Sequence, residues 1–221
     1  MELRRTWNMM NHKKILRLMR KYDFLAKVRR KNPYKQILKA GQEHKTKKNI
    51  LKRDFKWDTP LTKMWTDISY VRFNGKWCYL SIVKDMVTGE VPSHVLSRNL
   101  SMWATLESVE LLEEQYTKQE LECMLLHSDQ WFHYTHPSYQ TRLETLWITQ
   151  SMSRKWNCLD NAPTESFFGH MKDEIDIAHC ESFEELEEYI ENYIFEYNNN
   201  RPQWNKKKMT PVQYRNHLLD N

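Results

Sequence analysis

Residues 65–73 and 76–84 form two runs rich in apolar, β-branched and aromatic residues, the composition typical of β-strands. The Asn74-Gly75 pair lies between them. This pair favours a type I′ turn, because both residues tolerate a positive φ. The pattern therefore predicts a tight antiparallel hairpin.

The remaining apolar runs alternate between strand and helix spacing. Three further short strands are expected, at residues 90–97, 123–127 and 148–151. Apolar residues three and four apart predict helices, at residues 11–22, 101–116, 137–146, from about 161 and from about 183. The order is a three-stranded meander followed by alternating helices and strands, so we expect an α/β fold with a mixed sheet.

Two helix starts carry cap signals. Asn11 precedes the first apolar-periodic stretch and is expected as its N-cap. Ser182, with Glu185 three residues later, forms a capping-box pattern before the helix that we expect to be the last. The aromatic face of that helix is expected to belong to the core.

The composition is that of a globular protein. A chain of 221 residues with 40% hydrophobic content can form one sizeable domain and a smaller attachment. It contains no run of 18 apolar residues and opens with no charged-then-apolar leader, so we expect a soluble protein of the cytosol with no membrane partner. The four cysteines lack C-x-x-C spacing. His127 and His133 match no zinc motif, and we expect them to be exposed polar residues.

Positive charge is concentrated in residues 1–56, where only four residues are acidic. A basic segment of this kind suits contact with a polyanion, and DNA is the first candidate. The alternative is a solvated surface segment, and the charge alone does not decide between them.

Three carboxylates stand in distinctive surroundings. Asp67 lies in Trp-Thr-Asp-Ile-Ser-Tyr, Asp129 closes an apolar run, and Glu165 lies near a helix start. If the fold brings them together, they could hold two divalent metal ions, the apparatus that cuts and joins phosphodiesters. Each also has an ordinary interpretation: a polar strand residue, a turn residue and a first-turn carboxylate that complements the helix dipole.

The sequence around these carboxylates resembles one family. His-Ser-Asp-Gln at 127–130, Gln-Ser-Met-Ser-Arg-Lys at 150–155 and the Glu-Ser-Phe-Phe of 165–168 are similar to the DDE transposases of bacterial insertion sequences, whose core is shared with retroviral integrases. The resemblance runs from about residue 11 to 218. It implies a ribonuclease-H-like, mixed five-stranded sheet flanked by helices, with a short, basic helical extension at the N-terminus.

The resemblance also implies a mechanism. Asp67 would lie within the first strand, Asp129 at the end of the adjacent fourth strand, and Glu165 on the helix after the fifth. The triad would bind Mg²⁺ or Mn²⁺, as two ions, and catalyse DNA strand cleavage and strand transfer during transposition. Two alternatives stay open: a catalytically inactive DNA-binding remnant, and a ribonuclease-H-like nuclease without a role in transposition.

Partners and domains follow from the same resemblance. Residues 1–58 would be a truncated helix-turn-helix remnant with a basic linker, and 59–221 an integrase-type catalytic core with a C-terminal helix. The protein would bind element ends and target DNA as a homo-oligomer, with a possible separate helix-turn-helix protein from an upstream frame, in the bacterial cytoplasm at the nucleoid. The expected DNA contacts are Lys172, two helical turns after Glu165, and Arg154, Lys155, Lys13 and Arg17.

Three tryptophans depart from the family pattern. Trp131, Trp147 and Trp156 stand where relatives usually carry glycine, and the chain has only four glycines, whereas average usage would give about fifteen. Trp147 falls between a helix and a strand, where a left-handed glycine is expected. One hypothesis explains all three: a UGA codon that the source organism reads as glycine is here translated as tryptophan.

Overall fold

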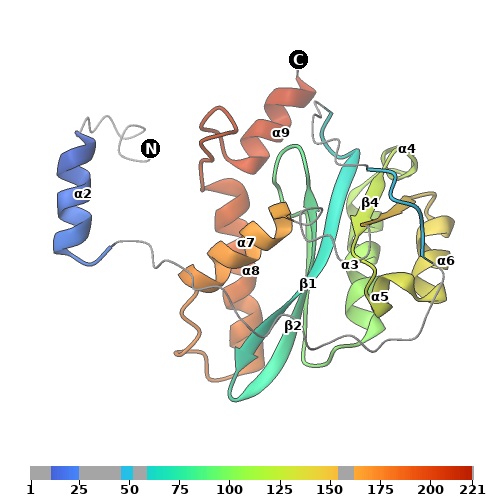
Figure 1. Cartoon of the computed structure of the whole chain (residues 1–221), viewed down its shortest axis with the longest axis horizontal. Helices are drawn as coiled ribbons and strands as arrows, with labels where there is room; N and C mark the ends of the chain where they lie inside the picture. Colours follow the sequence, from blue (N-terminus) through green and yellow to red (C-terminus); the bar gives the residue numbers. More distant parts are fainter. Residues whose placement is uncertain (1–10, 25–45, 52–58, 154–161, 221) are drawn as a thin grey trace.

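The computed structural model describes residues 11–24, 46–51, 59–153 and 162–220, with only the helical backbone described for 162–165. Its centre is a five-stranded sheet with the strand order β3-β2-β1-β4-β5 (Figure 1). β1 pairs antiparallel with β2 and β2 with β3, whereas β1–β4 and β4–β5 are parallel. The strands are β1 Lys63–Phe73, β2 Lys76–Asp85, β3 Ser93–Ser97, β4 Leu125–Ser128 and β5 Thr149–Met152. The expected mixed sheet is confirmed.

The turn between β1 and β2 has the predicted chemistry. Asn74 and Gly75 both adopt positive φ, at 46° and 74°. Two consecutive positive φ values define a type I′ turn, whose twist matches that of the flanking strands. Phe73 and Lys76 therefore pair directly across the turn.

β3 begins later than expected. Asn198, on a distant helix, accepts a hydrogen bond from the Val91 N–H and donates one to the Val91 carbonyl, both at 2.9 Å. Because this side chain occupies both backbone groups of Val91, and because Pro92 has no N–H, the stretch before Ser93 cannot continue the ladder with β2.

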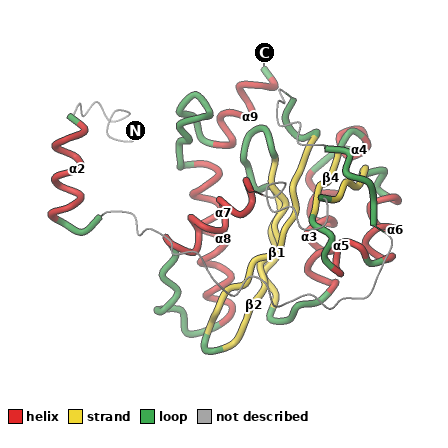
Figure 2. The backbone as a smooth tube through the Cα atoms, in the orientation of Figure 1, coloured by secondary structure: helices red, strands yellow, loops and turns green. Residues whose placement is uncertain are grey.

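Helices cover both faces of the sheet (Figure 2). Five predicted helices are observed, each within a few residues of its expected bounds: α2 His12–Lys21, α3 Met102–Gln115, α6 Pro137–Thr145, α7 Ala162–Glu174 and α8 Phe183–Asn199. Three were not predicted: α4 Lys118–Glu122, α5 Phe132–Thr135 and α9 Pro211–Leu219. The expectation that α8 is the last helix is therefore wrong. Thr210 and Gln213 form the full capping box that starts α9.

Two buried clusters lie on opposite faces of the sheet. The first joins β1 and β4 to α3, α5 and α6, through Met64, Leu126, Leu112, Tyr134 and Leu143 among others. The second joins β1 and β2 to α7 and α8, through Val71, Ile82, Phe167, Met171 and Ile190 among others. The domain is thus a three-layer sandwich, and the two faces can be assigned residue by residue from the alternation along the strands.

The caps of α2 and α8 agree with the sequence, with one correction. Asn11 accepts from the Lys13 N–H at 2.9 Å, as expected of an N-cap. Ser182 accepts from the Glu185 N–H at 3.1 Å. The Glu185 carboxylate, however, accepts from the Glu181 N–H at 2.8 Å, so the reciprocal half of the predicted box is shifted by one residue.

A stretch before the sheet packs against it. The Ile50 N–H donates to the Ser151 hydroxyl at 3.0 Å, and Leu51 is buried with Trp65 and Leu125. Residues 46–51, inside the segment expected to be an extended linker, therefore belong to the packed body. In the described part of the chain, no helix is both long enough and apolar enough to cross a membrane.

Candidate active site

Asp67 lies in the middle of β1, directly opposite Ile82 of β2. Opposed residues of neighbouring strands project from the same face of a sheet, and Ile82 belongs to the cluster that α7 and α8 cover. The Asp67 side chain is half-buried, and its Oδ1 accepts from the Ile68 N–H at 2.8 Å. Asp67 therefore lies at the centre of the sheet, on the side of α7.

Asp129 is the first residue after β4. The parallel register pairs Trp65 with His127, and two further residues along each strand place Asp67 beside Asp129. Tyr70 confirms that the two carboxylates are close. Its pKa is raised first by burial, then by Tyr79, and also by both Asp129 and Asp67. Parallel pairing of β1 with β4 thus brings together two residues that are far apart in the chain.

The Asp129 carboxylate has little compensation for its burial. Burial raises its pKa to about 6, and one hydrogen bond, from the Trp131 N–H at 2.9 Å, acts in the opposite direction. A carboxylate that loses water without gaining several donors favours a cation nearby, because the cation stabilises its charged form. Asp129 therefore has the chemistry of a ligand for a hard divalent metal.

Glu165 lies in the first turn of α7, two residues before Phe167. Phe167 and Phe168 are buried in the same cluster as Ile82, and α7 contacts β1 (Figure 1). The helix that carries Glu165 consequently covers the sheet face on which Asp67 lies. The side chain of Glu165 is outside the described residues. Among the described side chains, no group of three or more His, Cys, Asp or Glu residues could hold a metal ion.

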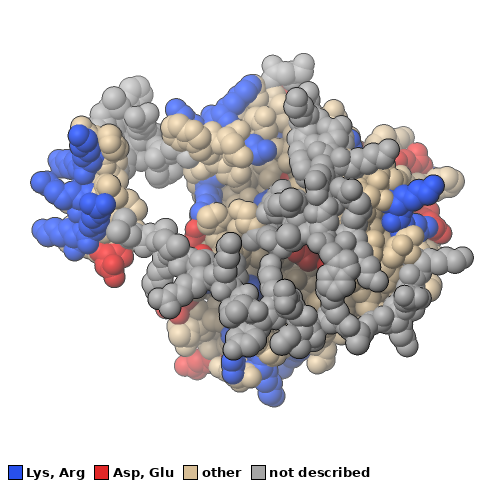
Figure 3. Space-filling model, viewed as in Figure 1, with Lys and Arg blue, Asp and Glu red and all other residues tan. Residues whose placement is uncertain are grey.

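The expected DNA contacts are placed only in part. Lys172 is half-buried in the last turn of α7. Lys13 and Arg17 are exposed on α2, whose surface is dense with cations (Figure 3). Arg154 and Lys155 lie outside the described residues.

Two groups beside the carboxylates were missed from the sequence. Tyr134 is fully buried; burial is the main cause that raises the pKa of its phenol, and Asp67 and Asp129 raise it further. Lys84 projects from β2 on the α7 side, and its Nζ lies 5.3 Å from the ring centre of Phe167. Burial, followed by the charge of Lys206, lowers the pKa of Lys84 to about 8. A lysine inside an apolar strand was the available signal.

The histidine prediction is wrong for two residues. His127 is fully buried within β4, and its Nδ1 lies 2.9 Å from the Ser151 hydroxyl. His133 is also buried, in α5. Both lie in regular elements that pack beneath helices, rather than in the loops where polar side chains are exposed.

Trp147 occupies a position that suits glycine. It follows α6 with a φ of 61°. Its N–H donates to the Glu144 carbonyl at 3.1 Å, and the Ile148 N–H donates to the Leu143 carbonyl at 2.9 Å. These two bonds define a Schellman motif, in which the left-handed residue is usually glycine. The expectation of a left-handed position at 147 is confirmed.

Trp131 differs from Trp147. Its φ is −70°, an ordinary extended value at the N-cap of α5, so its backbone does not require glycine. Its ring instead packs at 6.0 Å from that of Tyr70. Trp156 lies outside the described residues.

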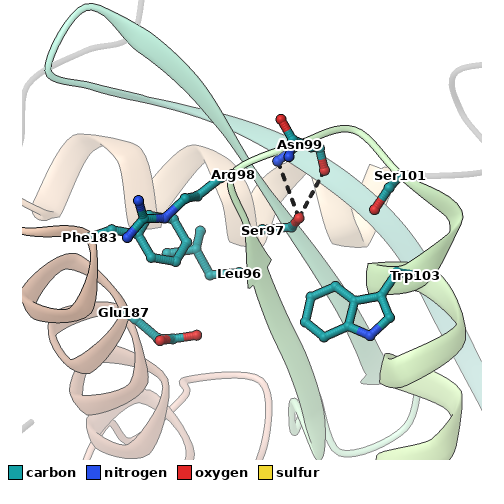
Figure 4. A pocket seen from close by; sticks show the side chains of 8 residues that line it. All are labelled: Leu96, Ser97, Arg98, Asn99, Ser101, Trp103, Phe183 and Glu187. Atoms are coloured by element: carbon teal, nitrogen blue, oxygen red, sulfur yellow. Dashed lines mark hydrogen bonds between the residues drawn. The ribbon is translucent and has the colours of Figure 1, made fainter.

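A surface pocket lies apart from the carboxylates. Its volume is about 390 Å³, and it lies between the end of β3, the start of α3 and α8 (Figure 4). Arg98 stacks on Phe183 at 4.4 Å and forms an ion pair with Glu184 at 2.7 Å. Ser97 exchanges hydrogen bonds with the backbone of Asn99. These contacts hold the β3–α3 connection against α8, and the lining includes none of the candidate site residues.

Comparisons with known proteins agree with this geometry. The integrase core domain family matches residues 165–219. An uncharacterized transposase-like protein of Haemophilus influenzae is 35% identical, over 95% of each chain. InsK, for insertion sequence element IS150 of Escherichia coli, is 38% identical, over 98% of this chain and 75% of InsK.

Solved structures share the fold. The HTLV-2 integrase catalytic core domain in complex with magnesium superposes with a TM-score of 0.55 at 14% identity, covering 71% of this chain and 97% of that one. The BIV integrase catalytic core gives 0.56 at 16% identity, covering 72% and 96%. The architecture is therefore the ribonuclease-H-like fold of retroviral integrase cores.

Proposed function

Because this chain belongs to the family of bacterial insertion-sequence transposases, we propose that it cuts and joins DNA strands at a divalent-metal centre formed by Asp67, Asp129 and Glu165. The observation that carries the proposal is the parallel β1–β4 register, which sets Asp67 beside a desolvated Asp129. Transposases and integrases as a group are polynucleotidyl transferases. The alternative of an inactive DNA-binding remnant is not favoured, because relatives are named as transposases and the two carboxylates lie together.

The donor set fits Mg²⁺ or Mn²⁺, which prefer carboxylate oxygens. Asp129 supports this fit, because it is buried with a single backbone donor and a cation would stabilise its charged form. When bound, two such ions supply Lewis-acid activation of the attacking oxygen and stabilisation of the leaving oxygen. Asp67 and Asp129 would hold the ions from the sheet, and Glu165 from the first turn of α7.

The rest of the chain would bind DNA. We assign phosphate contacts to Lys13 and Arg17 on α2, to Lys172 on α7, and to Arg154 and Lys155. Residues 1–58 act as a basic DNA-binding extension and 59–221 as the catalytic core. The chain works as a homo-oligomer on element ends and target DNA, in the bacterial cytoplasm at the nucleoid, with a possible helix-turn-helix protein encoded upstream.

The first test measures strand cleavage and transfer with a labelled duplex that carries the element ends. Products should form with Mg²⁺ or Mn²⁺ and disappear in EDTA, and Glu165→Gln should abolish them while DNA binding persists. Glu174→Gln, on the same helix but paired with Arg201 at 2.5 Å, is the matched control. Equal activity in EDTA, or a Glu165→Gln protein as active as the control, would overturn the metal mechanism.

The second test concerns the basic extension. A chain lacking residues 1–45 keeps the 46–51 segment that packs on β5, so loss of DNA affinity cannot be attributed to damage of the sheet. Affinity should fall, and the slope of log affinity against log salt should become shallower by about 0.9 for each phosphate contact removed. An unchanged slope would show that the extension does not contact DNA.

A further inference from the structure

Aromatic rings connect the free end of the β1–β2 hairpin to the candidate active site. Tyr70 makes edge-to-face contacts with Trp77 at 6.0 Å and with Trp131 at 6.0 Å. Tyr79 flanks Tyr70 at 5.2 Å. We call Trp77, Tyr70 and Trp131 the hairpin aromatic path, because the three rings run in that order toward the carboxylates.

Strand packing explains only part of this arrangement. Tyr70 and Tyr79 are directly opposed across the hairpin, and such pairs commonly stabilise antiparallel strands. The contact between Tyr70 and Trp131 is different, since it joins the hairpin to a residue whose N–H donates to Asp129. Trp77, at the outer end, is 52% exposed. Hairpin stability alone does not require an exposed indole to be linked to the site.

The charges around the path are positive. Residues 70–79 include Arg72 and Lys76, both exposed, and no acidic residue. The Arg72 guanidinium lies 5.7 Å from the centre of the Trp77 ring. Exposed rings that offer stacking faces, beside cations that attract phosphates, are the usual chemistry of single-stranded nucleic acid binding.

We propose that the hairpin aromatic path binds unpaired nucleotides of the DNA strand next to the phosphate held at Asp129. This inference rests on the proposed function and adds the form of the substrate: a duplex whose end is opened beside the site. Paired bases hide their faces within the duplex, whereas unpaired bases can stack on Trp77, with their phosphates beside Arg72 and Lys76.

The test compares two DNAs that share one duplex, one blunt and one with a short unpaired tail at the element end. Binding is measured with the full chain carrying Asp129→Asn and without metal, so that catalysis does not enter. Trp77→Thr removes the ring and keeps a good strand former. It should weaken binding of the tailed DNA about tenfold, the effect of losing stacking on one base, and leave the blunt DNA unchanged. Trp77→Phe should retain most of the affinity for the tailed DNA.

Trp204→Thr is the matched control, because Trp204 is also exposed and lies 5.0 Å from the Nζ of Lys208. It should behave like the parent on both DNAs. Equal losses on the two DNAs, or none, in a Trp77→Thr protein that folds would overturn the inference while leaving the transposase assignment standing. Failure of the parent chain to bind either DNA would contradict the proposed function itself.

Discussion

Asp85 and Asp129 are two desolvated aspartates at strand ends, but they have different surroundings. Burial raises the pKa of each above its ordinary value. Asp85 accepts three backbone hydrogen bonds, from the N–H groups of Leu61, Val87 and Thr88, at 2.6, 2.6 and 3.0 Å. Asp129 accepts one printed backbone bond, from Trp131 at 2.9 Å.

The difference separates a structural carboxylate from one suited to chemistry. The three donors use both oxygens of Asp85 to hold the loop after β2 against the residue that precedes β1. Asp129 retains acceptor capacity that a metal ion could use, and the β1–β4 pairing sets a second carboxylate beside it. Burial of an acid therefore says little about its role until its donors are counted.

The largest expected effect is on catalysis. Asp129→Asn should lower strand cleavage and transfer by about a thousandfold or more, since a metal ligand supplies several kcal/mol of transition-state stabilisation. Asp85→Asn should remain active at a temperature where it is folded. The measurement is single-turnover product formation with each purified variant. The comparison breaks if the two variants lose activity equally.

The ranking should reverse for stability. Asp85→Asn places an amide NH₂ against backbone donors in a fully buried site, so the free energy of unfolding should fall by about 2–4 kcal/mol. Asp129→Asn should be as stable as the parent or more so at pH 7, because it removes a poorly compensated charge. Urea unfolding monitored by circular dichroism measures both. A destabilised Asp129→Asn protein would show that Asp129 also has a structural role.

A smaller effect concerns pH. The folded-state pKa of Asp129, about 6, lies above the ordinary value of 3.8. Between these values the folded protein binds more protons than the unfolded chain, so this residue makes stability fall as pH rises through that window. In EDTA, the Asp129→Asn protein should show a weaker decline than the parent over this range. Unfolding midpoints that follow the same pH curve in both proteins would contradict the assigned shift.

The smallest expected effect extends the comparison to a backbone whose demand is not met by its residue. Trp147→Gly should stabilise the fold by about 1 kcal/mol, because glycine adopts the left-handed conformation of the Schellman motif without a Cβ penalty. Trp103→Gly, at an equally exposed indole inside α3, should destabilise by a similar amount. Thermal unfolding of both variants decides the matter. A loss of stability in Trp147→Gly would mean that its indole contributes more than its backbone costs.

The gene offers a separate test of the same position. The decoding hypothesis expects TGA at codons 131, 147 and 156, and TGG at 65, 77 and 204. The φ of 61° at Trp147 fits a genomic glycine there, whereas Trp131 has an ordinary backbone. TGG at all six codons would reject the hypothesis. Trp77, the outer residue of the hairpin aromatic path, is expected to be a genuine tryptophan in either case.

Local signals were sufficient for much of the fold. Asn74-Gly75 specified the hairpin, and helical spacing located α2, α3, α6 and α8. The one-turn helices α4 and α5 are too short for an apolar period to develop. α9 was missed although Thr210, Pro211 and Gln213 carry a capping-box signature.

Long-range contacts decided the rest. The late start of β3 depends on Asn198, more than a hundred residues away in the chain. The burial of His127, and the aromatic rings around Lys84, likewise come from elements that no local pattern links to them. Asp67 and Asp129 could be proposed from their sequence words, but their proximity depends on a parallel register that only the assembled sheet provides.

The placement of α7 and α8 has a consequence for biosynthesis. β1, β2 and β3 can pair as soon as residue 97 has left the ribosome, but the face that carries Asp67 is covered only by helices that end at Glu174 and Asn199. A nascent chain, or one cut short by a premature stop codon, therefore exposes that apolar face and lacks the enclosed centre. Aggregation and proteolysis should remove such fragments, so DNA would meet the cutting centre only in finished molecules.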